Sequence, residues 1–183
     1  LELLEANPAR PVARIAFVQQ GLCSLAVQRA AYEGGLQACA RAAELYAEAL
    51  GPQSIELASV GVTEARLRFA AGAEAEARVL LDATEPRLLA AGRAVDLRDA
   101  GLLRLRLAVR DNDWRRVEDA GQRLLATLPE PTHGGLSAER LVAQAFAALG
   151  RYKRTRDPPS VAAARQAAEL LLGRDDQVAY LTA

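Results

Sequence analysis

The stretch Ala43–Leu81 reads AELYAEALGPQSIELASVGVTEARLRFAAGAEAEARVLL. It contains the end of one helix with regularly spaced apolar residues, a Gly-Pro break, a second helix, a turn at residues 71–73 and the start of a third helix. This order predicts a helical hairpin with its entry and exit, and the rest of the chain reads as variations on it. The sequence therefore indicates an architecture, but it does not identify a partner.

The middle helix of this stretch has the clearest signals. Gly51 and Pro52 end the helix before it, and the hydroxyl of Ser54 can cap its first turn. Its apolar residues follow at spacings of three or four, as one face of a helix requires: Ile55, Ala58, Val62, Ala65 and Phe69. An earlier helix has a similar apolar face, which we expect to be core: Val12, Ile15, Ala16, Leu22, Leu25 and Ala26.

The same signals predict an all-α chain, because no segment alternates apolar and polar residues as a strand does. We expect helical hairpins at residues 11–51, 53–92, 94–129 and 137–173. Residues 1–6 resemble the tail of a further helix, and Tyr32–Gly35 is expected to be the turn of the first hairpin. We also expect Pro86 to break the second hairpin, and a basic insert at 151–157 to follow a helix that ends at Gly150.

Composition limits the class of protein. The 183 residues can bury a core in one large or two small domains. Apolar residues make up 51% of the chain and aromatic residues only 4%, which suits closely packed helices rich in Ala and Leu. The 23 basic and 23 acidic residues balance, which argues against a field strong enough to hold nucleic acid. No apolar run approaches the roughly 18 to 20 residues of a membrane span, so we expect no membrane association.

Two cysteines, Cys23 and Cys39, make neither a disulfide framework nor a zinc site. Cys39 is expected to be a buried small hydrophobic residue rather than a reactive thiol, and the setting to be reducing and cytoplasmic. The opening LELLEANPARP is no signal peptide. Because it looks like the middle of a helix and the chain has no Met, we expect a piece of a longer protein.

A turn position recurs along the chain. It is occupied by Ala30, Gly72, Asn112 and Gly150, at spacings of 42, 40 and 38. Two residues after these positions come Tyr32, Glu74, Trp114 and Tyr152. Three residues later come Gly35, Ala77 and Val117, which are small enough to let paired helices touch. Four residues further on come Cys39, Leu81 and Gly121.

With small residues at the helix crossing, an aromatic residue after the turn and a closing proline, the chain resembles the tetratricopeptide repeat (TPR) family. Residues 45–77 look like its longer form of roughly 42 residues, found in kinesin light chains and bacterial signalling proteins. The resemblance covers nearly the whole chain. It implies a right-handed solenoid of about four hairpins plus a partial one at the N-terminus. It also implies a scaffold that binds a peptide or partner protein, for instance as the regulatory segment of a larger bacterial signalling protein.

In such a solenoid the first helix of each hairpin typically lines the concave face, where extended peptides bind. The resemblance places seven polar residues on or near this face: Ser24, Gln28, Arg66, Arg106, Arg110, Arg140 and Gln144. Because arginine can grip a carboxylate with two hydrogen bonds, an acidic peptide or a chain terminus is the expected ligand. The same residues also fit solvated helix faces paired with neighbouring Glu and Asp.

Two other functions stay open. One is a structural role, in which the chain packs against another domain or a second copy. The other is nucleic-acid binding through the basic run at 151–156, although a solvated segment is the commoner meaning of such a run. Trp114 is expected to pack between repeats rather than anchor a partner. The lone His133 has no nucleophile arrangement, and no phosphate loop, metal-ligand spacing or paired carboxylates stand out, so we expect no enzyme, no metal and no cofactor.

Overall fold

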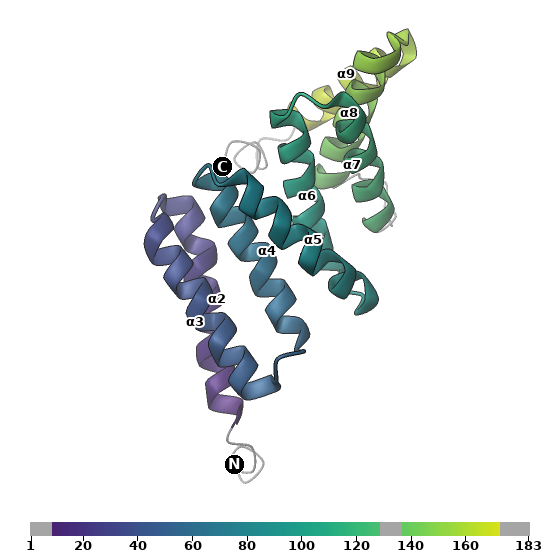
Figure 1. Cartoon of the computed structure of the whole chain (residues 1–183). Coiled ribbons are helices and arrows are strands. Elements are labelled where there is room, and N and C mark those ends of the chain that lie inside the picture. Colours follow the sequence, from purple (N-terminus) through teal and green to yellow (C-terminus); the bar gives the residue numbers. More distant parts are fainter. Residues whose placement is uncertain (1–8, 129–136, 173–183) are drawn as a thin grey trace. The chain divides into compact units, whose positions relative to one another are not determined.

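A computed structural model describes residues 9–128 and 137–172 of the chain (Figure 1). Its helices are α2 (Ala9–Arg29), α3 (Tyr32–Leu50), α4 (Ile55–Ala70), α5 (Glu74–Ala90), α6 (Ala94–Arg110), α7 (Trp114–Thr127), α8 (Ala138–Thr155) and α9 (Pro158–Leu172). Within these two ranges no residue lies in a strand, so the all-α prediction is confirmed. The expected helix tail at 1–6, the loop after Leu128 and the stop at Gly173 lie outside the described residues.

The chain divides into two compact units, residues 1–96 and 97–183. In the first unit α2 packs on α3, α3 on α4 and α4 on α5, and α4 also contacts α2. In the second unit α7 packs on α8 and α8 on α9. Helices that are neighbours in the chain are therefore neighbours in space within each unit. A single repeat domain and its superhelix remain predictions.

A residue with left-handed backbone marks the turn inside each hairpin. These residues are Ala30 (φ 53°), Gly72 (φ 83°), Asn112 (φ 56°) and Arg156 (φ 59°), at spacings of 42, 40 and 44, and Gly92 (φ 64°) has left-handed backbone in the connection between α5 and α6 as well. The second helix of each hairpin begins two residues later, at Tyr32, Glu74, Trp114 and Pro158. The first three predicted turn positions are thus confirmed. Left-handed backbone costs a non-glycine residue roughly 1–2 kcal/mol, so its recurrence indicates that the connection itself requires this geometry.

The fourth predicted turn, Gly150, is wrong. Helix α8 continues through Gly150 to Thr155, so the expected basic insert is mostly the last turns of a helix. Gly150 is buried against α7, where an added Cβ would lie 2.7 Å from the backbone nitrogen of Glu118 and 2.8 Å from the carbonyl oxygen of Trp114. Glycine is present here because two helices cross closely, which in sequence looks the same as a glycine that ends a helix.

Two further predictions of breaks are wrong. Helix α3 begins at Tyr32, so the expected turn Tyr32–Gly35 is its first turn. Helix α5 is continuous through Pro86. Its last turn is held by tertiary contacts, because Leu88 is fully buried and Arg87 donates hydrogen bonds to the carbonyl oxygens of Gln53 (3.2 Å) and Ser54 (2.9 Å). These contacts offset the backbone hydrogen bond that proline removes.

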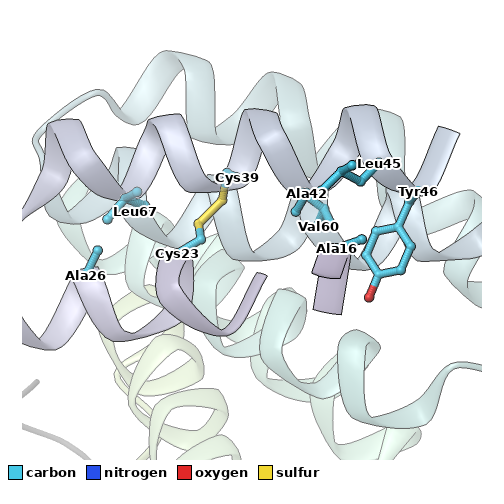
Figure 2. Packing of buried hydrophobic residues seen from close by; sticks show 9 residues of the cluster. All are labelled: Ala16, Cys23, Ala26, Cys39, Ala42, Leu45, Tyr46, Val60 and Leu67. Atoms are coloured by element: carbon cyan, nitrogen blue, oxygen red, sulfur yellow. A yellow bond between two sulfur atoms is a disulfide. The ribbon is translucent and has the colours of Figure 1, made fainter. Parts of the chain in front are cut away.

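Helices α2, α3 and α4 share the core shown in Figure 2, which contains Ala16, Cys23, Ala26, Cys39, Ala42, Leu45, Tyr46, Val60 and Leu67. Cys23 and Cys39 form a disulfide in this core, with their Cα atoms 5.3 Å apart and both residues fully buried. Burial of Cys39 is confirmed, whereas the expectation of reduced cysteines without a disulfide is wrong. The two residues are 16 apart in sequence, and only closure of the α2–α3 hairpin brings them together.

The close crossing of α7 and α8 predicts that Gly150→Ala destabilises the protein. A methyl group would meet backbone atoms of α7, and overpacking of this kind costs about 1–3 kcal/mol. This cost is expected to outweigh the gain of about 1 kcal/mol in helix propensity. The matched control is Gly21→Ala in α2, where nothing lies within 4 Å of the added Cβ and the change should raise stability by about 0.5–1 kcal/mol. Urea unfolding midpoints that shift in the same direction for both variants would contradict this account.

Candidate functional site

The seven polar residues predicted for binding all lie on the first helices of their hairpins. Ser24 and Gln28 are on α2, Arg66 on α4, Arg106 and Arg110 on α6, and Arg140 and Gln144 on α8. The first three belong to the first compact unit and the others to the second, so the two groups are described separately. Gln28, Arg106 and Arg110 are exposed, and the other four are half-buried.

The arginines of this set also interact within the protein. The guanidinium of Arg140 donates a hydrogen bond to the carbonyl oxygen of Leu128 (3.3 Å). Arg66, Arg106 and Arg110 each have an interaction with the protein as well. A guanidinium has five N–H donors, so an internal contact leaves donors that a carboxylate can engage.

The basic run that suggested nucleic acid is largely used inside the second unit. Arg151 Nε lies 3.0 Å from Glu118 Oε1, and Arg154 NH2 lies 2.9 Å from Glu118 Oε2. The Lys153 Nζ atom is 5.1 Å from the centre of the Trp114 ring. Trp114 itself is half-buried and packs against the cluster of Leu105, Ala108, Val117 and Val142, which agrees with its expected packing role. These contacts join α8 to α7, so the basic run has a structural role.

Glu118 is the buried partner of this run. The side chain of Glu118 is 8% exposed, while those of Arg151 and Arg154 are 53% and 51% exposed. Burial raises the pKa of the Glu118 carboxyl, but the hydrogen bonds from Arg154 and Arg151 outweigh it, and the pKa ends below the ordinary value. The carboxylate is therefore charged at neutral pH, as a structural ion pair requires, rather than poised for proton transfer.

A second polar cluster, which sequence analysis missed, lies in the first unit. Arg93 donates hydrogen bonds to Glu56 Oε1 (2.8 Å), to Asp96 Oδ2 (2.9 Å) and to the hydroxyl of the buried Ser59 (3.0 Å). Its pKa is raised chiefly by the hydrogen bond to Glu56. The cluster ties the first turns of α4 to the connection between α5 and α6. Only the Arg93–Asp96 spacing of three was visible in sequence, since Glu56 is 37 residues from Arg93.

Helix α2 leaves part of its apolar face uncovered. The structure buries Ala16, Cys23 and Ala26, but five large apolar residues of the same helix stay exposed. One is Phe17 (70%), and the other four follow one another at intervals of three, four and three: Ile15 (52%), Val18 (58%), Leu22 (49%) and Leu25 (45%). The expectation that Ile15, Leu22 and Leu25 are core is therefore wrong. Apolar residues occupy a wider arc of α2 than α3 and α4 can cover. We call these four exposed residues the α2 stripe.

An open cleft of about 490 Å³ adjoins the α2 stripe. Leu22 and Leu25 of the stripe line it on the α2 side, and Ala38 lines it from α3. Its polar lining includes Gln19, Arg29, Gln37 and Arg41. Arg41 also pairs with Glu44, at 2.9 Å, on the exposed surface of α3. The cleft therefore shares Leu22 and Leu25 with the α2 stripe, and arginine side chains lie at its margin.

Other kinds of site find little support in the part of the chain that the structure describes. There, His, Cys, Asp and Glu side chains do not gather in groups of three or more that could hold a metal ion. Among the helices described, none is long and apolar enough to cross a membrane. His133 lies outside the described residues. No family model, curated protein or solved structure matches the chain.

Proposed function

We propose that this chain is a non-catalytic scaffold of TPR-like helical hairpins that binds a peptide or partner protein. The observation that carries the proposal is the succession of helical hairpins, each with a left-handed residue in its turn and a second helix that begins two residues later; Gly92, between α5 and α6, has the same geometry. Repeated hairpins of this kind present equivalent side chains at regular intervals, which suits recognition of extended partners. The regulatory segment of a larger bacterial signalling protein is the setting we propose.

The proposed binding residues are the seven on the first helices of the hairpins. Their placement on α2, α4, α6 and α8 is what a shared binding surface requires. The proposed ligand is acidic, because arginine matches carboxylate geometry and four of the seven residues are arginines.

A charge-reversal pull-down tests the proposal. Wild type and the double variant Arg66→Glu, Arg106→Glu are used to capture proteins from lysate of the source cell, after circular dichroism shows equal helix content. We expect one partner to be retained by wild type and lost by the variant. The matched control is Arg115→Glu, Arg165→Glu, which reverses the same charge at two exposed positions on the second helices α7 and α9. Equal loss in both double variants would point to net charge and contradict the assigned row.

The proposed location is the cytoplasm, and the disulfide makes this testable. Structural disulfides are rare in reducing compartments. Denaturation of intact source cells in acid, followed by alkylation, reports the state of Cys23 and Cys39 in the cell. Alkylated thiols would agree with a cytoplasmic location, and a pair protected until reduction would contradict it.

A further inference from the structure

The α2 stripe has the spacing of a helix-binding surface. Ile15, Val18, Leu22 and Leu25 follow one another at intervals of three, four and three, which places them along one side of α2. The ten steps along the helix from Ile15 to Leu25 rise about 15 Å, or nearly three helical turns. Single exposed apolar residues are ordinary on protein surfaces, whereas a continuous stripe beside a cleft is typical of an interaction site.

The stripe lies in a positively charged setting. Every charged residue of α2 is an arginine, and Arg14 and Arg29 flank the stripe near its two ends. Across the cleft, Arg41 of α3 adds a third guanidinium, which pairs with Glu44 at 2.9 Å. Gln19 and Gln37 supply neutral hydrogen-bonding groups between the arginines. The surface therefore combines an apolar centre with a basic margin.

We propose that the α2 stripe and its cleft bind an amphipathic helix of a partner protein whose apolar face is flanked by Asp and Glu. Apolar residues at i, i+3, i+4 and i+7 of such a helix would cover the stripe, and one of them would enter the cleft. The acidic flanks would meet Arg14, Arg29 and Arg41. The inference rests on the proposed scaffold function but assigns a second surface, separate in chemistry from the arginine row.

Charge argues against a second copy of this chain as the occupant. Antiparallel pairing of two α2 stripes about the point between Val18 and Leu22 would bring Arg14 of one copy within about one turn of Arg29 of the other. Parallel pairing would place each arginine beside its own equivalent. Like charges so placed are destabilising, and α2 has no acidic residue to offset them. Residues 1–6, LELLEA, have acidic and apolar side chains but are fewer than the 11 residues from Ile15 to Leu25.

A display selection tests the proposal with a defined probe. The library consists of 18-residue peptides with Leu at i, i+3, i+4 and i+7 and with flanking positions randomised among Glu, Lys, Gln and Ala, and the bait is the full 183-residue chain. We expect the selected peptides to be enriched in Glu over Lys, and their affinity to fall as salt rises. Leu22→Glu, Leu25→Glu should weaken binding by about tenfold or more. Arg29→Glu should shift the selected flanks from Glu towards Lys.

The control variant is Phe17→Glu, which changes a 70% exposed apolar residue of the same helix outside the stripe and should leave binding unchanged. Circular dichroism and thermal unfolding confirm that each variant is folded. No enriched peptide, no preference for Glu, or undiminished binding by Leu22→Glu, Leu25→Glu would each overturn the proposal. Loss of the peptides only in Arg66→Glu, Arg106→Glu would overturn the α2 assignment while the scaffold function survives.

Two measurements distinguish a partner helix from the two alternative occupants, a second copy of the chain and its own residues 1–8. Light scattering that shows a wild-type dimer, converted to monomer by Leu22→Glu, would identify a second copy and overturn the proposal. If residues 1–8 occupy the stripe, they compete with the peptide, and their deletion should strengthen peptide binding by about tenfold. That result would identify this segment as the occupant and overturn the proposal. Monomeric wild type with unchanged affinity after the deletion supports a separate partner helix.

Discussion

Loss of the Cys23–Cys39 disulfide is expected to lower the free energy of unfolding by about 3 kcal/mol. The bond closes a loop between residues 16 apart, and such a cross-link restricts the unfolded chain more than the folded one. Comparison of the oxidised wild type with Cys23→Ala, Cys39→Ala in urea gives the difference directly. Ala is the suitable replacement because both sites are fully buried among apolar residues.

A reductant provides the control for this experiment. It should lower the unfolding midpoint of the wild type and leave that of the double alanine variant unchanged. Because both cysteines are fully buried, reduction in the absence of urea has to wait for the α2–α3 hairpin to open, so it should be slow. Equal midpoints for oxidised wild type, reduced wild type and the variant would show that the disulfide contributes nothing to stability.

The double variant Arg151→Ala, Arg154→Ala is expected to lose about 3–4 kcal/mol at pH 7, because it leaves the Glu118 carboxylate buried without a charged partner. Replacement of Glu118 by Gln should lower the free energy of unfolding by less. In Glu118→Gln the two arginines, each about half exposed, remain solvated. Urea unfolding of the three proteins measures this asymmetry. Equal losses in the two variants would show that burial of Glu118 is not the cause.

The difference in unfolding free energy between the wild type and Arg151→Ala, Arg154→Ala should depend on pH, because the two arginines lower the pKa of Glu118. In the wild type this pKa is lowered, so the ion pairs stabilise the protein above the ordinary pKa of Glu, and this contribution is lost as pH falls through the lowered value. In the double variant the two arginines are gone and a neutral hydrogen bond from Gln122 Nε2 (3.3 Å) remains, so burial raises the pKa and favours the protonated form. The stability difference between the two proteins should therefore shrink on acidification from neutral pH. A difference that stays constant below about pH 4, near the ordinary pKa of Glu, would contradict this account.

Local signals in the sequence were sufficient for the helices and for most of the turns. The apolar spacing from Ile55 to Phe69 predicts α4, and the Ser54 hydroxyl accepts the expected capping hydrogen bond from the backbone N–H of Glu56 (3.2 Å). Ala30, Gly72 and Asn112 were recognised as turns from their regular spacing and have left-handed backbone. These features depend on residues within a few positions of one another, so the sequence specifies them directly.

The role of a single glycine or proline was less predictable. Gly150 resembles a helix end but serves a helix crossing, and Pro86 resembles a break but lies within α5. In both cases the deciding contacts come from another helix or connection: from Glu118 and Trp114 in α7, and from the residues before α4 that accept hydrogen bonds from Arg87. Contacts between residues more than 30 positions apart leave no local periodicity to detect.

The sequence by itself determined an all-helical chain and the three turns at Ala30, Gly72 and Asn112. Tertiary structure alone decided that Cys23 meets Cys39, that Glu118 is buried between two arginines, and that the apolar residues of α2 divide between core and surface. The physical reason is that helix period and turn conformation are set by neighbouring residues. Which side of a helix is covered depends on the number and angle of the helices packed against it.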